Sequence, residues 1–471
     1  MWTRTKWLIA ATCLIAFALR LGPLFDNRFH PDEALYSTWA LKIARGENAL
    51  LIGVPVDKPP LLIYLSALSF FVFGQSELAG RVPNLLASVI SVVVLYQIGR
   101  FGTGRLEASD NLPPLLLALS PFAISFAPTA FLDPTMIMFG LAALAAATRG
   151  RPAWAGVWLG LSLATKLQGV FFAPLVIVFA RHRSRQELLR MLAGAALIGL
   201  AVLAWDRARG GVPFWQQQAI NYGEVHISAA DEAGSRLAGW LAFLPYFFGP
   251  IAGAASVLGI AAFIVAYDRS GFRDSSARVD LALLGGLLGG FAFHWLIDFP
   301  IWDRYMLPLV PIAALLAGRG LALLITPVRR LGAVCWLLVA TSVLPFSLAA
   351  AQSQYPIGGD HGANDGIDLV AAYLKTLPSG TVVYEHGQAW VLGFYLGEGF
   401  AYLSYFDTPA VLTDELRVFG GEGRYIILSA DESLDRVVDA VGDVGYTLAP
   451  TFVTYNRFGR VSFTVFKIQA G

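Results

Sequence analysis

Cysteine and charge are scarce in this sequence. Its 471 residues include 2 cysteines, both within apolar runs, so a disulfide framework is not indicated. No nucleophile elbow, Walker loop, HExxH or CxxC motif occurs, which argues against common hydrolases, nucleotide-driven pumps and zinc enzymes. The formal net charge of +1 removes any general electrostatic case for nucleic acid.

Apolar residues, in contrast, make up 56% of the chain. They form repeated runs of about 14 to 25 residues, which is more apolar surface than one water-soluble core can bury. The chain is therefore predicted to be a polytopic α-helical membrane protein. The start, "MWTRTKWLIAATCLIAFAL", lacks the small-residue cleavage site of a signal peptide and is interpreted as an uncleaved first span.

Arginine clusters between the apolar segments set the expected topology. If all of them face the cytoplasm, the short segment 60–74 cannot be a full span, because counting it would place every later cluster outside. We therefore expect residues 33–46 and 60–74 to form two interfacial helices in a long first outer loop. About eleven transmembrane helices remain, with a cytoplasmic N-terminus.

The composition changes after residue 350. The polar, glycine-rich "AQSQYPIGGDHGANDG" reads as a linker, and it is followed by "GIDLVAAYLKTL", "TVVYEH", "YIILSA", "SLDRVVDAVGDVG" and "VSFTVFKI". These segments predict helix, strand, strand, helix and strand in that order. The predicted organisation is a transmembrane domain over 1–350 and a small extracytoplasmic α/β domain over 351–471.

This topology places the suggestive polar residues on the outer membrane face. They come from four separate loops: Asp32, Glu33 and Lys58 from the first, then Asp133, Lys166, and the sequence Asp303, Arg304, Tyr305. Two carboxylate sites and several cations therefore converge on one side of the membrane.

Each of these residues also has a purely structural interpretation. Asp32 and Glu33 open a predicted helix, where acidic side chains favour the helix dipole. Asp133 precedes Pro134 and suits an N-cap. Lys166 and Arg20 are placed to extend from helix ends to lipid headgroups. Arg304 has Asp303 beside it as an ion-pair partner.

A chemistry that uses acids and cations at this face is sugar transfer from a lipid-linked donor. When a polyprenyl-phosphate sugar reacts, the leaving lipid phosphate is stable as an anion and needs no general acid. One carboxylate base must take the acceptor's proton, and lysine or arginine must hold the departing phosphate.

Several segments together resemble the C-type (GT-C) membrane glycosyltransferases, nearest to the protein-mannosyltransferase and aminoarabinose-transferase branch. They are "LRLG", "PDEALYSTWALKIARGE", "DKPPLLIYLSALSFFVFGQSELAGRVPNLL", "ALSPFAISFAPTAFLDPTMIMF", "LSLATKLQG" and "DRYMLPLVP". The resemblance covers roughly residues 1–350 in order. The Trp-Trp-Asp signature of oligosaccharyltransferases is missing, so a lipid-pyrophosphate oligosaccharide donor is not expected.

The resemblance implies roles for individual residues. The first-loop acid Asp32, with Glu33 beside it, and the second-loop Asp133 are the expected catalytic carboxylates. The lysine of the Lys-Pro-Pro motif implies a lipid-phosphate ligand. With the other cations of this face, the predicted donor-binding set is Lys58, Lys166, Arg236, Arg304 and Tyr305, of which Arg236 is one choice among the basic residues of the loop at 206–239. Whether Asp32, Glu33 and Asp133 also bind a divalent metal ion is open.

The predicted function is an inverting glycosyltransferase at the outer face of the cytoplasmic membrane. Its partners would be a polyprenyl-phosphate-linked sugar donor, a protein, lipid or glycan acceptor, and the bilayer. The alternative is a transporter or flippase for a lipid-linked sugar, which predicts mid-bilayer charges and internal repeats. The sugar, the acceptor and the oligomeric state do not follow from the sequence.

Overall fold

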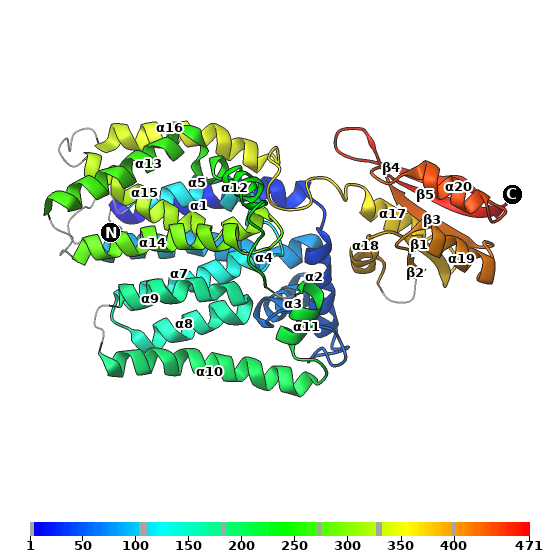
Figure 1. Cartoon of the computed structure of the whole chain (residues 1–471), viewed down its shortest axis with the longest axis horizontal. Coiled ribbons are helices and arrows are strands. Elements are labelled where there is room, and N and C mark those ends of the chain that lie inside the picture. The colour runs from blue at the N-terminus through cyan, green and yellow to red at the C-terminus, as the bar shows by residue number, and fades with distance from the viewer. Residues whose placement is uncertain are drawn as a thin grey trace. The chain divides into compact units, whose positions relative to one another are not determined.

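The computed structural model describes residues 4–102, 111–180, 184–223, 225–270, 275–325, 332–397 and 401–471. The chain divides into two compact units. The larger unit consists of residues 1–26 and 42–358 and is helical. The smaller unit consists of residues 27–41 and 359–471 and contains a five-stranded sheet. Figure 1 shows both units with most of their helices and strands labelled.

The larger unit is built from helices packed side by side (Figure 1). Their bounds are α1 (Arg4–Asp26), α3 (Leu61–Phe73), α4 (Glu77–Gly102), α5 (Leu112–Leu119), α6 (Pro121–Phe126), α7 (Asp133–Thr148), α8 (Pro152–Thr165), η1 (Leu167–Phe171), α9 (Phe172–Phe179), α10 (Arg185–Arg209), α11 (Phe214–Tyr222), α12 (Ala233–Leu241), α13 (Pro245–Ser270), α14 (Ser275–Leu296), η2 (Asp303–Met306), α15 (Leu309–Ile325) and α16 (Gly332–Ala351). Helix α2 (Pro31–Ala44) begins in the smaller unit.

Within the described residues, four helices are long and apolar enough to cross a bilayer. They are 6–26, 77–100, 185–209 and 277–296, and the pair 233–241 and 245–261 adds a fifth candidate that is bent by 80°. Shorter apolar helices lie among them. The protein is thus a multi-pass helical membrane protein, while the count of about eleven spans stays a prediction.

Two glycines explain local features of the helical packing. Gly249 has φ 75° inside α13, a backbone conformation that glycine adopts without strain, and Pro250 follows it, so the helix is interrupted there. At Gly156 a Cβ would lie 1.8 Å from the carbonyl oxygen of Met191, so α8 and α10 approach as closely as only a small residue permits.

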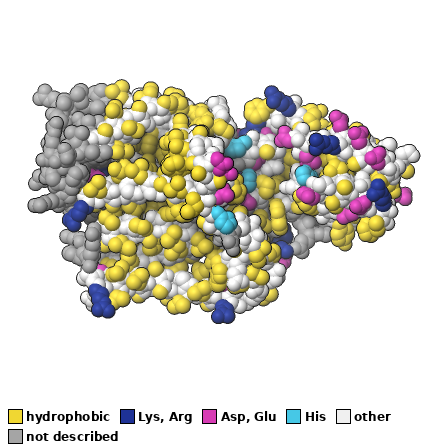
Figure 2. All heavy atoms as spheres, in the orientation of Figure 1, with side chains coloured by type: hydrophobic (Ala, Val, Ile, Leu, Met, Phe, Trp, Pro, Cys, Tyr) yellow, Lys and Arg dark blue, Asp and Glu magenta, His cyan; other side chains and the backbone are white. Residues whose placement is uncertain are grey.

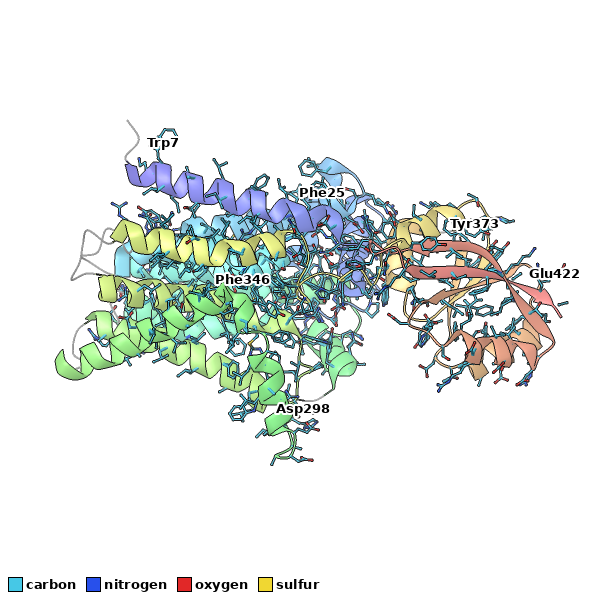
Figure 3. The ribbon with its side chains drawn as sticks, turned by 90° about the horizontal axis from the view of Figure 1, so that it is seen from above. Trp7, Phe25, Asp298, Phe346, Tyr373 and Glu422 are labelled. Atoms are coloured by element: carbon cyan, nitrogen blue, oxygen red, sulfur yellow. The ribbon has the colours of Figure 1, made fainter. Side chains whose placement is uncertain are left out.

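On the face shown in Figure 2, hydrophobic side chains cover much of the described part of the larger unit. Trp7 and Phe25 are 65% and 63% exposed and project from opposite ends of α1 (Figure 3). An apolar helix that ends in exposed aromatic side chains suits a lipid environment.

Arg20 corrects one sequence expectation. It is fully buried, and it does not extend to the membrane surface. Its guanidinium donates to the hydroxyl of Ser88 and to the carbonyl oxygens of Ala16, Leu117 and Ala118. Arg20 therefore ties α1 to α4 and α5 in the interior of the unit, where four acceptors replace its hydration.

The smaller unit is a mixed sheet with helices. The strands β1 (Thr381–Glu385), β2 (Ala401–Tyr405), β3 (Arg424–Ser429), β4 (Tyr446–Tyr455) and β5 (Val461–Ala470) lie in the order β2-β1-β3-β5-β4. The first three are parallel, and β5 pairs antiparallel with both β3 and β4. The helices are α17 (Ile367–Leu374), α18 (Ala389–Leu396), α19 (Pro409–Phe419) and α20 (Leu434–Gly442).

The five elements predicted here are all present, as α17, β1, β3, α20 and β5. Sequence reasoning missed α18, β2, α19 and β4. The ring of Tyr373 on α17 stacks on Phe452 of β4 at 4.7 Å, and Figure 3 shows α17 beside this part of the sheet. The predicted boundary between residues 350 and 351 stays a prediction, as does the extracytoplasmic location.

Candidate active site

The centre of the site in the larger unit is a buried ion pair. The ammonium group of Lys166 lies 2.8 Å from a carboxylate oxygen of Asp133. Asp133 is the first residue of α7, and Lys166 follows the last residue of α8. The Asp133 side chain is 1% exposed and that of Lys166 is 15% exposed. Two residues predicted separately for catalysis and donor binding are therefore in contact.

This contact bears on the structural interpretation of Asp133 as an N-cap. The N-cap position of α7 is Leu132, and the carboxylate of Asp133 makes its ion pair with Lys166. The predicted N-cap role is therefore wrong. Pro134 does stand in the first turn of α7, where its missing N–H costs no hydrogen bond.

Asn84 of α4 fixes the loop that carries Asp133, and sequence reasoning missed it. Its amide nitrogen donates to the carbonyl oxygens of Thr129 and Phe131, at 2.7 and 2.5 Å. Its amide oxygen accepts from the hydroxyl of Thr135 at 2.6 Å. In the sequence, the only sign of this role is a polar asparagine between apolar residues in "RVPNLL". That pattern does not indicate which residues Asn84 contacts.

Arg304 lies buried among aromatic rings beside this pair. Its guanidinium carbon is 4.4 Å from the ring centre of Trp302, 4.9 Å from that of Phe131 and 6.0 Å from that of Tyr305. The neighbouring carboxylate of Asp303 accepts from the backbone N–H groups of Arg304 and Gly358. These two hydrogen bonds hold the backbone at Arg304 against the backbone at Gly358.

Lys58, on the Lys-Pro-Pro segment, is the third cation of the site. It is 8% exposed, and its ammonium donates to Asp57 at 2.7 Å and to the hydroxyl of Tyr222 at 3.0 Å. The same Asp57 oxygen accepts from the side chain of Asn221. Arg209 donates to the carbonyl oxygen of Val54, which anchors this segment to the end of α10.

Aromatic contacts link the three cations into one continuous cluster. The ring of Tyr222, which meets Lys58, is 6.4 Å from that of Trp302, and Trp302 is 5.5 Å from Tyr305. The ring of Tyr305 lies 5.0 Å from the ammonium of Lys166. Lys166 also interacts electrostatically with the other two cations, Lys58 and Arg304. Four of the five predicted donor-binding residues, Lys58, Lys166, Arg304 and Tyr305, therefore lie together.

Arg236 of α12 makes its hydrogen bonds with residues 294–299. Its guanidinium donates to the carboxylate of Asp298 and to the carbonyl oxygens of His294, Trp295, Ile297 and Phe299. It therefore holds the chain between α14 and η2, and Figure 3 labels Asp298 in this region. Phosphate binding by Arg236 stays a prediction, and these acceptors compete with it.

The first-loop acids belong to the smaller unit, at the start of α2. Glu33 is fully buried and its carboxylate accepts from the backbone N–H of His30 at 3.0 Å. The backbone N–H of Asp32 donates to the imidazole of His30 at 3.2 Å. Glu33 therefore closes the first turn of the helix, as a capping glutamate does, and Asp32 is half-buried beside it.

The sequence left open a divalent metal ion at Asp32, Glu33 and Asp133, and the structure contradicts such a site. Nowhere in the described part of the chain do three or more His, Cys, Asp or Glu side chains gather as metal ligands would. The carboxylate of Asp133 is balanced by Lys166 instead. A lysine in that position supplies the positive charge that a cation would otherwise bring.

Removing one partner of the buried pair is expected to destabilise the fold. Asp133→Asn leaves the Lys166 ammonium buried without its counter-charge, which costs on the order of 3 kcal/mol. The double variant Asp133→Asn/Lys166→Gln removes both charges and should recover most of that loss. Thermal unfolding in detergent measures both, and equal midpoints for the single variant and wild type would contradict the predicted penalty.

Asp360 of the smaller unit predicts a pH effect on stability. Burial raises the pKa of its carboxyl from 3.8 to about 6, with Asp365 and Glu33 adding to the rise. Because the folded-state pKa is the higher one, ionised Asp360 destabilises the fold above pH 6, and this penalty fades as the pH falls toward 3.8. Asp360→Asn should therefore raise the unfolding midpoint at pH 7.5 and raise it less at pH 5. A gain that is the same at both values would refute this.

Part of the chain resembles known mannosyltransferases in sequence. Residues 57–205 match the model of the family described as dolichyl-phosphate-mannose-protein mannosyltransferase. A 160-residue segment is 28% identical to "Putative mannosyltransferase YycA" of Bacillus subtilis (strain 168), covering 32% of this chain. The match spans 23% of that relative's length, so the chain is similar to about a quarter of it.

Solved structures share the fold over nearly the whole chain. ArnT from Cupriavidus metallidurans bound to undecaprenyl phosphate has a TM-score of 0.66 at 16% identity, covering 98% of each chain. An Archaeoglobus fulgidus oligosaccharyltransferase in the apo form has a TM-score of 0.55 at 14% identity, covering 98% of this chain and 75% of the other. These structures show a shared fold, and together with the family-model match over residues 57–205 they confirm the resemblance to the C-type membrane glycosyltransferases. The sequence matches do not favour the transporter alternative.

Proposed function

We propose that this protein is an inverting glycosyltransferase that moves a sugar from a polyprenyl-phosphate donor to an acceptor at the outer face of the cytoplasmic membrane. The observation that carries the proposal is the cluster of Lys58, Lys166 and Arg304, three cations largely shielded from solvent that lie among aromatic rings in an apolar helical unit. The printed ligand of ArnT, undecaprenyl phosphate, supports a lipid phosphate as the group that this cluster holds.

Each of the three cations has an acidic residue beside it. Asp57 pairs with Lys58 and Asp133 pairs with Lys166, while the Asp303 carboxylate accepts from two backbone N–H groups. A phosphate placed among them would accept from all three side chains and spread its charge over them. Low local polarity strengthens such charge-assisted hydrogen bonds.

The reaction then needs one proton acceptor. In the proposed step the acceptor hydroxyl or amine loses its proton to Asp32, and its oxygen or nitrogen forms a bond to the anomeric carbon. The bond between that carbon and the phosphate oxygen breaks, and its electron pair stays on the phosphate. Attack from the face opposite the phosphate inverts the anomeric centre, and polyprenyl phosphate is released.

The remaining predicted residues take supporting roles in this proposal. Lys58, Lys166 and Arg304 offset the charge that grows on the leaving phosphate. Tyr305 and Trp302 exclude water and orient the cations through their ring faces. Glu33 and Asp133 are proposed to hold the acceptor side of the reaction together with Asp32, with Asp133 held in place by its ion pair with Lys166.

The direct test is turnover by the purified full-length protein in lipid nanodiscs. The substrates are polyprenyl-phosphate sugars that differ in the sugar, offered with membrane proteins and surface lipids as acceptors, and the readout is release of polyprenyl phosphate. Release that depends on an acceptor supports the proposal. Translocation of the intact donor across the bilayer without release would overturn it.

A further inference from the structure

The segment that precedes the first-loop acids is held by the C-terminal part of the chain. Residues 27–41 group with residues 359–471 into one compact unit, although more than 300 positions separate them in the sequence. Three successive residues, Asn27, Arg28 and Phe29, each contact a different partner in that part. The acids Asp32 and Glu33 follow within four residues.

Polar contacts fix the backbone of this segment. The side-chain nitrogen of Asn364 donates to the carbonyl oxygen of Phe29 at 2.9 Å, and both residues are buried. Arg457 donates to the side-chain oxygen of Asn27 at 3.2 Å. The same guanidinium forms a bidentate pair with Asp365 at 2.7 and 2.8 Å, which holds it in one orientation.

Two further contacts hold the same segment. The ring of Phe29 is fully buried and meets the ring of Phe394 on α18 edge to face, with 4.8 Å between centroids. Arg28 lies 3.7 Å from Asp368 on α17, and both side chains are partly exposed. The segment is therefore anchored through its backbone, an apolar side chain and charged groups.

From this anchored segment the chain leads directly into α2. Only His30 and Pro31 separate Phe29 from Asp32, and the imidazole and backbone N–H of His30 already bind the first turn. So short and constrained a connection transmits the position of Phe29 to Asp32. A displacement of about 1 Å in a reacting group costs about a hundredfold in rate.

We infer that Asn364 and Arg457 of the C-terminal unit are positioning residues for the first-loop acids Asp32 and Glu33, so that this unit forms part of the catalytic apparatus. The inference rests on the proposed function, because it takes Asp32 as the proton acceptor. It assigns the C-terminal unit a role in the rate of transfer, separate from any role in choosing the acceptor.

The test compares variants of Arg457 and Asn364 with a matched arginine control in the full-length protein. Arg457→Gln and Asn364→Ala should each lower kcat by about tenfold or more and leave the KM for donor and the binding of polyprenyl phosphate unchanged. Arg417→Gln is the control, because Arg417 also pairs with an aspartate of the same unit but on an exposed face of α19. It should retain wild-type kcat.

A charge exchange covers the case in which the Arg457 and Asn364 variants fail to fold. Arg28 and Asp368 are partly exposed, so Arg28→Asp and Asp368→Arg should fold, lower kcat singly and recover it when combined. Wild-type kcat in every single variant, in a preparation where Asp32→Asn is inactive, would overturn the inference alone. Absence of transfer in the wild type would instead overturn the proposed function.

Discussion

Replacing Asp32 with asparagine is expected to abolish sugar transfer. The amide is nearly isosteric with the carboxylate but cannot take a proton from the acceptor, and loss of a positioned base costs about a hundredfold or more in rate. Polyprenyl phosphate should still bind, because its proposed ligands are Lys58, Lys166 and Arg304. The measurement is the initial rate of lipid phosphate release, paired with a binding titration of the same preparation.

The matched control for Asp32→Asn is Glu47→Gln. Glu47 lies on the same first loop, is 43% exposed and pairs only weakly with Arg45 at 3.4 Å. It should leave the rate of transfer unchanged. Wild-type turnover by Asp32→Asn would show that another group takes the proton, with Glu33 the nearest candidate along the chain.

Replacing Lys58 with alanine is expected to weaken the binding of polyprenyl phosphate by about tenfold, the loss of one charge-assisted hydrogen bond. Arg304→Ala should have a similar effect for the same reason. Binding is measured by titrating polyprenyl phosphate into the purified protein. Arg45→Ala serves as control, since Arg45 is an exposed cation of the same loop that donates to Gln75 and Glu47.

A companion variant separates lost binding from lost folding. Lys58→Ala alone leaves the carboxylate of Asp57 buried at 3% exposure, which is a destabilising change. Lys58→Ala/Asp57→Asn removes both charges and keeps Asn221 near its partner. Binding that stays weak in this double variant assigns the loss to the ammonium group. Wild-type affinity in the double variant and in Arg304→Ala would remove the basis for a phosphate site here.

The class of protein follows from local properties of the sequence. Long apolar runs predict membrane helices because hydrophobic burial depends on each run's own composition. The periodicity of the segments after residue 366 predicts α17, β1 and β5. The acids and cations at the candidate site are visible for a similar reason, since a charge beside an apolar run is conspicuous wherever the run folds.

The partners of those side chains were decided by the tertiary structure. Asp133 looked like an N-cap, and Arg20 looked like a residue reaching for the headgroups, because a local pattern offers only local partners. Lys166 lies 33 positions from Asp133, and the carbonyl that Arg20 meets at Leu117 lies 97 positions away. Such contacts depend on how helices pack, which no neighbouring residue specifies.

The contacts that hold the start of the first loop show this difference between local and tertiary information most clearly. The sequence by itself determined that Asp32 and Glu33 open a helix and that an α/β segment follows the last apolar run. Only the tertiary structure joined Phe29 to Asn364, a hydrogen bond across 335 positions. Periodicity encodes which face of an element is buried, whereas the partner of one carbonyl oxygen depends on the packing of a distant loop, because hydrogen bonds require an alignment that the chain reaches only when folded.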